Sequence, residues 1–337
     1  MAAFRVARVV VGLSLAVATR GAAVRPAGPL QRAMEAMAAA NAEALAVREE
    51  RELIGVRTGG VGALVRTSLD GLARTEGELG GYMARQGCIG VSRVLSQPTA
   101  DTLLAYINAE VETAKADVDR GDVPFGARFG GVNCRGPGTY GFRQDLFLPA
   151  SAPPVRAALG EAFRALAPLL RATVGPDGAI HEVSSLVADP GAPRQCVHAD
   201  TIVLPCAQFP TAKMAPLFTF FVALQDVEEG MGHTVFLPRT HTADAHALWN
   251  VPQKQKEAFI SLHAAVQSNL RLGDAAVFDS RLLHCGRANT SAKRRVLFYF
   301  TLSSQPDWPL PDGLHGSNSI REEDWRRWRV RDFCPDL

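Results

Sequence analysis

The sequence lacks several features that would assign it quickly to a class. No stretch of 18 uninterrupted apolar residues occurs, which argues against an integral membrane span. The 36 Lys and Arg residues against 34 Asp and Glu leave a net charge of +2, so the broad basic excess typical of nucleic-acid-binding proteins is missing. No internal repeat is found either. What remains, with 47% hydrophobic and 21% charged residues, is a composition that can build an ordinary globular core.

Cysteine is present, but not in a metal-binding or redox spacing. The six cysteines are Cys88, Cys134, Cys196, Cys206, Cys285 and Cys334. Because no C-x-x-C pair occurs, neither a zinc ribbon nor a thioredoxin-type site is indicated. Cys196 and Cys285 each lie beside a candidate metal ligand introduced below. Small apolar packing is their expected role, and a shared disulfide or metal role stays open.

The N-terminus carries a targeting pattern. Arg5 and Arg8 precede an apolar run over residues 9–18 that ends in the small-x-small triplet Ala16-Val17-Ala18, the order of a secretory signal. The following arginines and alanines, with few acidic residues, also fit an organelle transit peptide. We therefore expect a signal or transit peptide over residues 1–28 and a location in the secretory pathway or an organelle. Without such targeting the protein would be cytoplasmic.

Helical periodicity dominates the first half of the chain. Apolar residues at helical spacing predict helices over 29–54, 62–76, 99–118 and 154–173. Pro168 should break or kink the last of these helices. A short strand is expected at 88–91, and the Gly-rich stretch 119–141 is expected to form a long loop. Residues 29–86 are therefore interpreted as a helical extension ahead of the main domain.

From about residue 180 the pattern changes to short strands separated by turns. We expect strands over 180–188, 195–198, 217–226, 233–237, 275–278 and 295–303. Residues 218–224 are continuously apolar, which predicts that their strand is buried on both faces. Helices followed by antiparallel strands indicate an α+β domain.

Three residues in this strand-rich part form the pattern of a metal site. His198 and Asp200 stand in an H-x-D string, and on an extended segment their side chains point to the same face. His284 follows the predicted strand 275–278. Two imidazoles and one carboxylate form the facial triad that holds Fe(II) and leaves coordination positions open. H-x-D alone is a weak signal, however, because a lone histidine is usually a core or loop residue with a satisfied hydrogen bond.

The order of motifs around the three residues is more specific than the residues themselves. In chain order these motifs are Leu224-Gln225-Asp226-Val227, Gly232-His233-Thr234, Pro238-Arg239-Thr240-His241, Gly273-Asp274, and Asn289-Thr290-Ser291 followed by Arg294-Arg295. This order resembles the phytanoyl-CoA dioxygenase-like branch of the Fe(II)/2-oxoglutarate-dependent oxygenases. The resemblance covers about residues 88–303 and is strongest over 195–303.

The resemblance implies a double-stranded β-helix, a jelly-roll or cupin-like core with flanking N-terminal helices, in a dioxygenase domain over 87–305. It implies that His198, Asp200 and His284 bind the iron. The family's cosubstrate arginine lies 11 residues after the second histidine, which here is Arg295. On a strand that begins there, Arg295 points into the barrel and can bind 2-oxoglutarate in bidentate fashion, while Arg294 points outward. A register shift of one residue would exchange the two roles.

Two positions depart from the family pattern. Some members carry a hydroxyl two residues after the second histidine that helps to bind the cosubstrate. This chain has Gly286 there, so another donor must serve. Gln195 could donate to the cosubstrate or pair with strand backbone. The second departure is Pro238-Arg239-Thr240-His241 where the family often has P-G-S-H, which removes a glycine from the turn.

Asp200 bears on the type of chemistry. Related halogenases have a small residue in place of this carboxylate, so its presence implies hydroxylation or a related oxidation. The implied cofactors are Fe(II), the cosubstrates 2-oxoglutarate and O2, and ascorbate as reductant, with succinate and CO2 as products. By family habit we expect a small-molecule or lipid substrate. Two alternatives are a peptidyl hydroxylase of the secretory pathway and a non-catalytic jelly-roll binding protein.

Away from the triad the sequence is less informative. Arg143 and Asp145 follow the Gly-rich loop and either line the pocket or, as the preferred interpretation, form a structural salt bridge. Glu182 and Ser184 share a strand face that can point into the barrel. The C-terminal residues 306–337, which mix Trp with Arg, are expected to pack on the domain rather than to bind nucleic acid.

Overall fold

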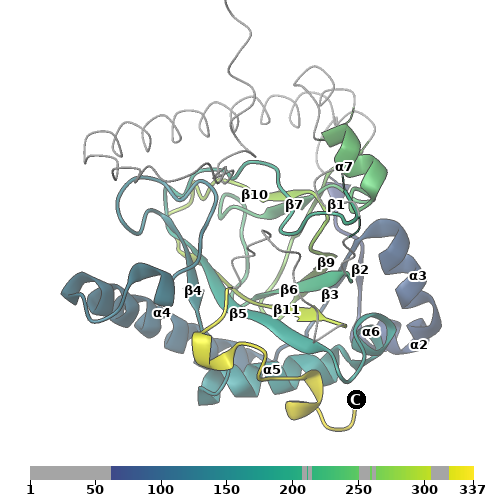
Figure 1. The fold of residues 1–337 in the computed structure, drawn as a ribbon, viewed down its shortest axis with the longest axis horizontal. Coiled ribbons are helices and arrows are strands. Elements are labelled where there is room, and N and C mark those ends of the chain that lie inside the picture. Colours follow the sequence, from purple (N-terminus) through teal and green to yellow (C-terminus); the bar gives the residue numbers. More distant parts are fainter. Residues whose placement is uncertain (1–61, 207–210, 212–214, 250–258, 260–262, 305–318) are drawn as a thin grey trace, which may run out of the picture.

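The structure is a computed structural model that describes residues 62–206, 211, 215–249, 259, 263–304 and 319–337. The predicted targeting segment 1–28 and the predicted helix 29–54 lie outside the described residues. Two β-sheets form the centre of the described part, and helices pack against the larger one (Figure 1). The mixed architecture confirms the predicted α+β class with a double-stranded β-helix core.

The larger sheet has the spatial strand order β2-β3-β9-β6-β11-β5-β4. The strands are β2 (Arg66–Thr67), β3 (Cys88–Val91), β9 (Ala275–Asp279), β6 (Leu217–Ala223), β11 (Arg295–Ser303), β5 (Ala179–Ala188) and β4 (Arg143–Phe147). All neighbours in this sheet pair antiparallel except β2 with β3. β11 is hydrogen-bonded to β5 on one side and β6 on the other, which fixes the direction of each of its side chains.

The smaller sheet has the order β1-β8-β7-β10. Its strands are β1 (Gly62–Ala63), β8 (Val266–Gln267), β7 (Thr234–Phe236) and β10 (His284–Gly286). β10 pairs antiparallel with β7, so that His284 lies opposite Phe236. This short sheet therefore holds one of the predicted metal ligands on a strand.

β6 is buried on both faces, as its continuous apolar run predicted. Phe218, Phe220 and Val222 belong to the large core between the sheet and the helices, whereas Phe221 and Ala223 belong to a second core inside the barrel. A strand that contributes to two cores cannot alternate apolar with polar residues, which explains why this segment lacks the period-2 pattern.

Five of the described helices cover the outer face of the larger sheet (Figure 1): α2 (Leu69–Arg74), α3 (Glu76–Gln86), α4 (Gln97–Arg120), α5 (Pro153–Ala165) and α6 (Ala167–Thr173). The short helix α7 (Ala243–Trp249) instead packs beside the smaller sheet, in a core with Val235 and Cys285. Single 3-10 turns occupy η1 (Phe125–Ala127), η2 (Glu322–Asp324) and η3 (Val330–Asp332). α4 confirms the helix expected over 99–118. The break between α5 and α6 confirms the effect of Pro168, which has no N–H to continue the first helix.

The helix predicted over 62–76 is wrong at its beginning. Residues 62–67 contain β1 and β2 instead, and helix α2 starts only after Ser68, whose side chain accepts a hydrogen bond from the Gly71 N–H at 3.1 Å. β1 and β2 pair with β8 and β3, so sheet hydrogen bonds outweighed the local helical pattern. These residues extend both sheets rather than the helical layer.

The C-terminal segment 319–337 packs on the domain. The Asp324 carboxylate accepts hydrogen bonds from the Ala150 N–H at 2.7 Å and from Trp328 Nε1 at 2.6 Å. Trp328 is thereby docked, whereas Trp325 stays 36% exposed. Within the described residues, no helix is both long and apolar enough to cross a membrane.

Candidate metal centre

His198, Asp200 and His284 converge although they come from separate segments. The backbone of His198 exchanges two hydrogen bonds with that of His284, 2.9 Å and 2.8 Å long. The Asp200 N–H then donates to the Ser280 carbonyl at 2.8 Å. The strand predicted over 195–198 is wrong in extent, because the segment forms only this isolated bridge. The bridge still places the two imidazoles side by side, with ring centroids 4.5 Å apart.

The ligand atoms of the three side chains face one another. Nε2 of His198 and Nε2 of His284 each lie 3.6 Å from Oδ1 of Asp200. The other ring nitrogens are engaged by backbone: Nδ1 of His198 lies 2.8 Å from the Cys196 carbonyl, and Nδ1 of His284 lies 2.9 Å from the Leu282 carbonyl. A carbonyl can only accept, so Nδ1 carries the proton and Nε2 presents its lone pair to the centre.

Electrostatics keep both imidazoles neutral. Burial lowers the pKa of His198 to about 4, helped by the neighbouring His284, and burial lowers the pKa of His284 to about 4 as well. Desolvation by the surrounding protein raises the pKa of the Asp200 carboxyl. The side chain is nevertheless 35% exposed to solvent. A bound divalent cation would favour the ionised form of this carboxyl over the protonated one. The site therefore offers two neutral imidazoles and one carboxyl group.

This donor set fits a first-row divalent metal ion. All three ligand atoms lie within 4.8 Å of one another, and two imidazoles with one carboxylate on one side of a metal suit non-haem Fe(II). Phe278 and Phe236 flank the His284 ring, with centroids 4.8 Å and 6.0 Å away. These rings cover the His284 imidazole, whereas the side chains of His198 and Asp200 are 21% and 35% exposed.

Arg295 begins β11 and points into the barrel. Its Nη1 donates to the Gly232 carbonyl, whereas Nε and Nη2 have no hydrogen-bond partner among the described residues. The side chain is 1% exposed, and burial lowers its pKa to about 9, which still leaves it charged at neutral pH. Arg294 points the other way and donates from Nε to the Asp189 carboxylate at 2.5 Å. The predicted register of this strand is therefore confirmed.

Arg143 is a second buried cation that the sequence interpretation placed wrongly. It was expected to form a salt bridge with Asp145, but the described residues show no ion pair between the two. Nη2 of Arg143 donates to the carbonyls of Pro193 at 2.9 Å and Arg287 at 3.1 Å, while Nε and Nη1 have no partner. Burial lowers the pKa of its guanidinium to about 10. The sequence signal for this burial was the position of Arg143 in the short stretch R-Q-D-L-F, which forms β4 and is buried throughout.

Gln195 pairs with backbone rather than presenting its oxygen to the site. Its Oε1 accepts a hydrogen bond from the Gly286 N–H at 2.8 Å. A Cβ atom at Gly286 would lie 2.6 Å from this oxygen and 3.1 Å from Nη1 of Arg143. The absence of a side chain at residue 286 is therefore a requirement of the packing around Gln195 and Arg143.

The inner wall at the other end of β11 carries carboxyl and hydroxyl groups. Asp145 accepts hydrogen bonds from the hydroxyls of Ser184, Tyr299 and Ser319, and Glu182 accepts from Thr301 at 2.5 Å. The face shared by Glu182 and Ser184 thus points into the barrel. Desolvation raises the pKa of both carboxyls, that of Glu182 to about 8. We call Asp145, Glu182 and their hydroxyl partners the acid end of the barrel.

None of the cysteines near the triad, Cys196 and Cys285 included, forms a disulfide. The Cys196 sulfur lies 4.0 Å from that of Cys134, and the Cys285 sulfur lies 3.3 Å from Nη2 of Arg194. Neither cysteine belongs to the group of three possible metal ligands.

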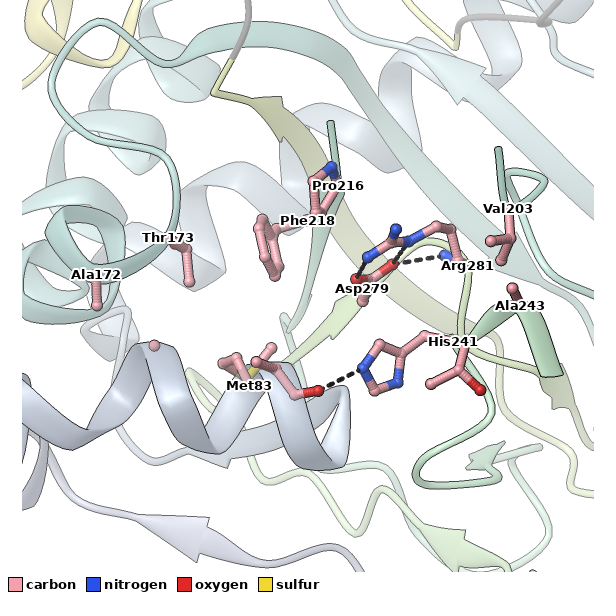
Figure 2. Close-up of a pocket in the computed structure, with 13 residues that line it drawn as sticks. Met83, Ala172, Thr173, Val203, Pro216, Phe218, His241, Ala243, Asp279 and Arg281 are labelled. Carbon is pink, nitrogen blue, oxygen red and sulfur yellow. Dashed lines mark hydrogen bonds and ion pairs between the residues drawn. The ribbon is translucent and has the colours of Figure 1, made fainter. Parts of the chain in front are cut away.

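A pocket of about 390 Å³ lies apart from the three candidate ligands (Figure 2). It opens between α3, α6 and the turn after β9, and its wall includes His241 and the ion pair of Arg281 with Asp279 at 2.6 Å. None of the three candidate ligands lines this pocket. Its turn residues flank Ser280, which binds the Asp200 backbone. The pocket therefore does not contain the metal site.

Sequence comparison identifies the family. The model of the phytanoyl-CoA dioxygenase (PhyH) family matches residues 83–297, more than half of the chain. The fold and this match together define a 2-oxoglutarate-dependent non-haem iron dioxygenase. The chain belongs to the phytanoyl-CoA dioxygenase family. No curated protein matches the sequence.

Several solved structures have a similar fold. The carbocyclase SnoK from nogalamycin biosynthesis, a non-haem α-ketoglutarate-dependent enzyme, is 17% identical with a TM-score of 0.49, over 70% of this chain and 86% of that chain. EctD from S. alaskensis with bound Fe is 20% identical with a TM-score of 0.47, over 66% and 75%. HygX from Streptomyces hygroscopicus, with nickel and 2-oxoglutarate bound, is 16% identical with a TM-score of 0.43, over 67% and 86%. Likeness at this level bears on no functional detail.

Proposed function

We propose that this protein is an Fe(II)- and 2-oxoglutarate-dependent dioxygenase that hydroxylates a small polar molecule, with succinate and CO2 as coproducts. The observation that carries the proposal is the convergence of Nε2 of His198, Nε2 of His284 and Oδ1 of Asp200, with both Nδ1 atoms fixed by backbone carbonyls. A site with both ring orientations fixed in this way is prepared for a metal.

Each group of residues at the site has a proposed role. His198, Asp200 and His284 would hold Fe(II), which supplies the O2-dependent oxidation that side chains cannot perform. Arg295 would bind a carboxylate of 2-oxoglutarate through Nε and Nη2, the two donors that have no protein partner. The Phe278 and Phe236 rings beside His284 exclude water from one side of the site. Ascorbate is proposed only as the reductant that maintains Fe(II).

The inner wall favours a small polar substrate over a lipid. Asp145, Glu182, Tyr299 and Thr301 present carboxyl and hydroxyl groups inside the barrel. An alkyl chain would make no hydrogen bond to this wall. A substrate with hydroxyl or amine groups could donate to the carboxyl lone pairs that the protein hydroxyls leave free.

The test uses the full chain in anaerobic solution. Addition of Fe(II) and then 2-oxoglutarate should give the visible charge-transfer band of the chelated metal, and the His198→Ala variant should give none. Under air and with ascorbate, succinate formed above the His198→Ala level across a panel of polar and lipid substrates would identify the substrate class. No band in the wild-type protein would instead favour a jelly-roll protein that binds ligands without catalysis.

Targeting is a separate proposal that rests on sequence. We propose that residues 1–28 direct the protein to the secretory pathway or an organelle and are removed there, leaving the extension 29–86, the dioxygenase domain 87–305 and the tail 306–337. A secretory location would favour peptide substrates, in which case a peptide panel should gain one oxygen atom per molecule. N-terminal sequencing of the mature protein tests the cleavage; an intact Met1 contradicts it.

A further inference from the structure

Two cysteine sulfurs from segments far apart in the sequence lie in contact beside the metal centre. Sγ of Cys134 is 4.0 Å from Sγ of Cys196, across 62 positions of sequence, and neither residue belongs to a disulfide. A disulfide bond is about 2.05 Å long, so each sulfur would need to move about 1 Å for a bond to form. The fold therefore holds two thiols close to bonding distance.

Cys196 is held in place by its neighbours on the metal-binding segment. The Gln195 N–H donates to the Gly286 carbonyl at 2.8 Å, and the backbone of His198 exchanges two hydrogen bonds with β10. The Cys196 carbonyl also accepts a hydrogen bond from Nδ1 of His198 at 2.8 Å. Hydrogen bonds on both sides of Cys196 fix its position, so the movement needed for a bond has to come from Cys134.

Cys134 lies in a loop whose backbone is less constrained. Residues 130–142 contain no helix or strand, and five of them are glycines, which lower the cost of changing the backbone conformation. Cys134 itself has a φ of 53°, in the left-handed region that residues other than glycine seldom adopt. Such a conformation persists only where the surroundings determine it, and it is common near functional sites.

Residues 130–134 of this loop line the inside of the barrel. Val132 packs against the core inside the barrel. The Gly130 N–H donates to the Asp145 carbonyl at 2.8 Å, and a Cβ atom at residue 130 would collide with the carboxyl of the same residue. The stretch therefore runs from the acid end to the metal-binding segment, and a bond at its last residue, Cys134, would fix it in place.

The two sulfurs differ in access to solvent. Cys196 is partly exposed, whereas Cys134 is buried. The Arg143 guanidinium interacts electrostatically with Cys134, and a nearby cation favours the thiolate over the thiol. An oxidant can therefore reach the pair at Cys196, and Cys134 can complete the bond.

We propose that Cys134 and Cys196 form a reversible disulfide that fixes residues 130–134 against the metal-binding segment under oxidising conditions. The oxidant is a small-molecule disulfide such as glutathione disulfide. One protein thiol displaces a first glutathione thiol to give a mixed disulfide, and the other protein thiol then displaces the second glutathione thiol. The two protein thiols lose two electrons and two protons, which the oxidant takes up to become two thiols.

The test maps the cysteine pairs of the full chain, with Fe(II) present and O2 absent so that the metal generates no oxidant. The reduced protein is incubated with glutathione disulfide, and its remaining thiols are blocked before digestion with trypsin. The proposed bond joins peptide 129–135 to peptide 195–213. The second peptide also contains Cys206, so Cys206→Ser is the matched control and should leave the joined peptides unchanged. Cys134→Ser and Cys196→Ser should abolish them.

Two further readouts measure whether the bond fixes the loop. Cleavage of the native protein by trypsin after Arg135, the residue next to Cys134, should slow about tenfold or more on oxidation. The Tm should rise by about 5 °C or more, because the bond closes a long loop in the unfolded chain. Both changes should reverse when a thiol reductant is added, and both should be absent in Cys134→Ser.

A disulfide that joins Cys196 to a different cysteine would overturn the proposal, as would a glutathione that stays attached to either residue, since the two sulfurs would then not reach each other. Formation of the bond without protection at Arg135 would also overturn it, because the loop would not be fixed. The peptide map of the wild-type protein needs no variant, so it decides the pairing even where a serine variant fails to fold. None of these readouts depends on 2-oxoglutarate or on turnover, so their outcome is separate from that of the proposed function.

Discussion

The two ends of the barrel differ in whether their buried ionisable side chains have hydrogen-bond partners. At one end Arg143 and Arg295 keep donors without a hydrogen-bond partner, and neither pairs with a carboxylate of the described residues. At the acid end Asp145 takes three hydroxyl donors, and Glu182 takes the Thr301 hydroxyl. Both ends are formed largely by the same strands, β4, β5 and β11. The difference therefore lies in the side chains and not in the fold.

This contrast distinguishes donors that need a ligand from carboxyl groups that already have protein partners. Buried polar groups are normally satisfied within the protein, as they are at the acid end. Unsatisfied buried donors cost free energy unless a ligand accepts from them. The arginine end should accordingly respond to ligand, and the acid end to pH.

The largest effect is expected at the triad. His284→Ala removes one of three metal ligands, so Fe(II) affinity should fall by more than the roughly 10- to 100-fold typical of losing a supporting partner. Metal-dependent turnover should be lost with it. Equilibrium dialysis with Fe(II) or Ni(II) measures the affinity. The control is His246→Ala, which changes a histidine that contacts the Arg281 carbonyl. Equal losses of metal affinity in both variants would show that the triad is not the metal site.

The arginine end is tested by the adjacent pair Arg295 and Arg294. Arg295→Gln should raise the dissociation constant for 2-oxoglutarate about 100-fold or more, because a carboxylate would lose a buried charged partner worth about 3–5 kcal/mol. Arg294→Gln, which loses its contact with Asp189 on the opposite face, should change it less than about twofold. A reversed result would show that the strand register is shifted by one residue.

The acid end is tested through pH. The pKa of Glu182 is raised to about 8 in the fold, so the folded state keeps a proton that the unfolded state releases above about pH 4.5. The stability that this group contributes is present below pH 4.5 and is lost as pH rises through 8. Glu182→Gln should therefore be more stable than wild type by about 4 kcal/mol at pH 8 and gain little at pH 4.5.

Urea unfolding at the two pH values measures this difference. Glu78→Gln, at an exposed position in α3, should show no such pH dependence. The same gain for Glu182→Gln at both pH values would show that the charge of the carboxyl is not the cause.

The smallest effect is expected for Tyr299→Phe. It removes one of the three hydroxyl donors to Asp145, which should cost about 1 kcal/mol of unfolding free energy. Because Tyr299 belongs to the acid end, the affinity for 2-oxoglutarate should stay within about twofold of wild type. A large loss of that affinity would mean that the two ends are coupled, and the comparison between them would fail.

Much of the strand-rich half could be predicted from sequence because local pattern and tertiary role agree there. β11 has the predicted bounds, since its side chains are buried on both sides throughout. The triad could be predicted because H-x-D fixes two side chains on one face. His284 could be predicted as the third ligand only from the order of the surrounding motifs, because its local sequence does not indicate that it lies near His198.

The rest depended on long-range contacts. Residues 62–67 pair with strands more than 20 positions away, and nothing in their own sequence shows that partner. Arg143 stands two residues from Asp145, so the sequence suggests an ion pair between them. In the structure the Asp145 carboxylate instead accepts hydrogen bonds from hydroxyls of β5, β11 and Ser319. The space at Gly286 likewise depends on Gln195, which is 91 positions away.

The two-way backbone bridge between His198 and His284 has a consequence for how such a protein can change over evolutionary time. The geometry of the ligand pair is set by hydrogen bonds between the two histidine residues themselves, not by the long excursion of chain that separates them. Segments within that excursion can lengthen, shorten or be exchanged while the imidazoles keep their spacing. The chemistry of the centre can thus be inherited unchanged by descendants whose surrounding loops have diverged to accept different molecules.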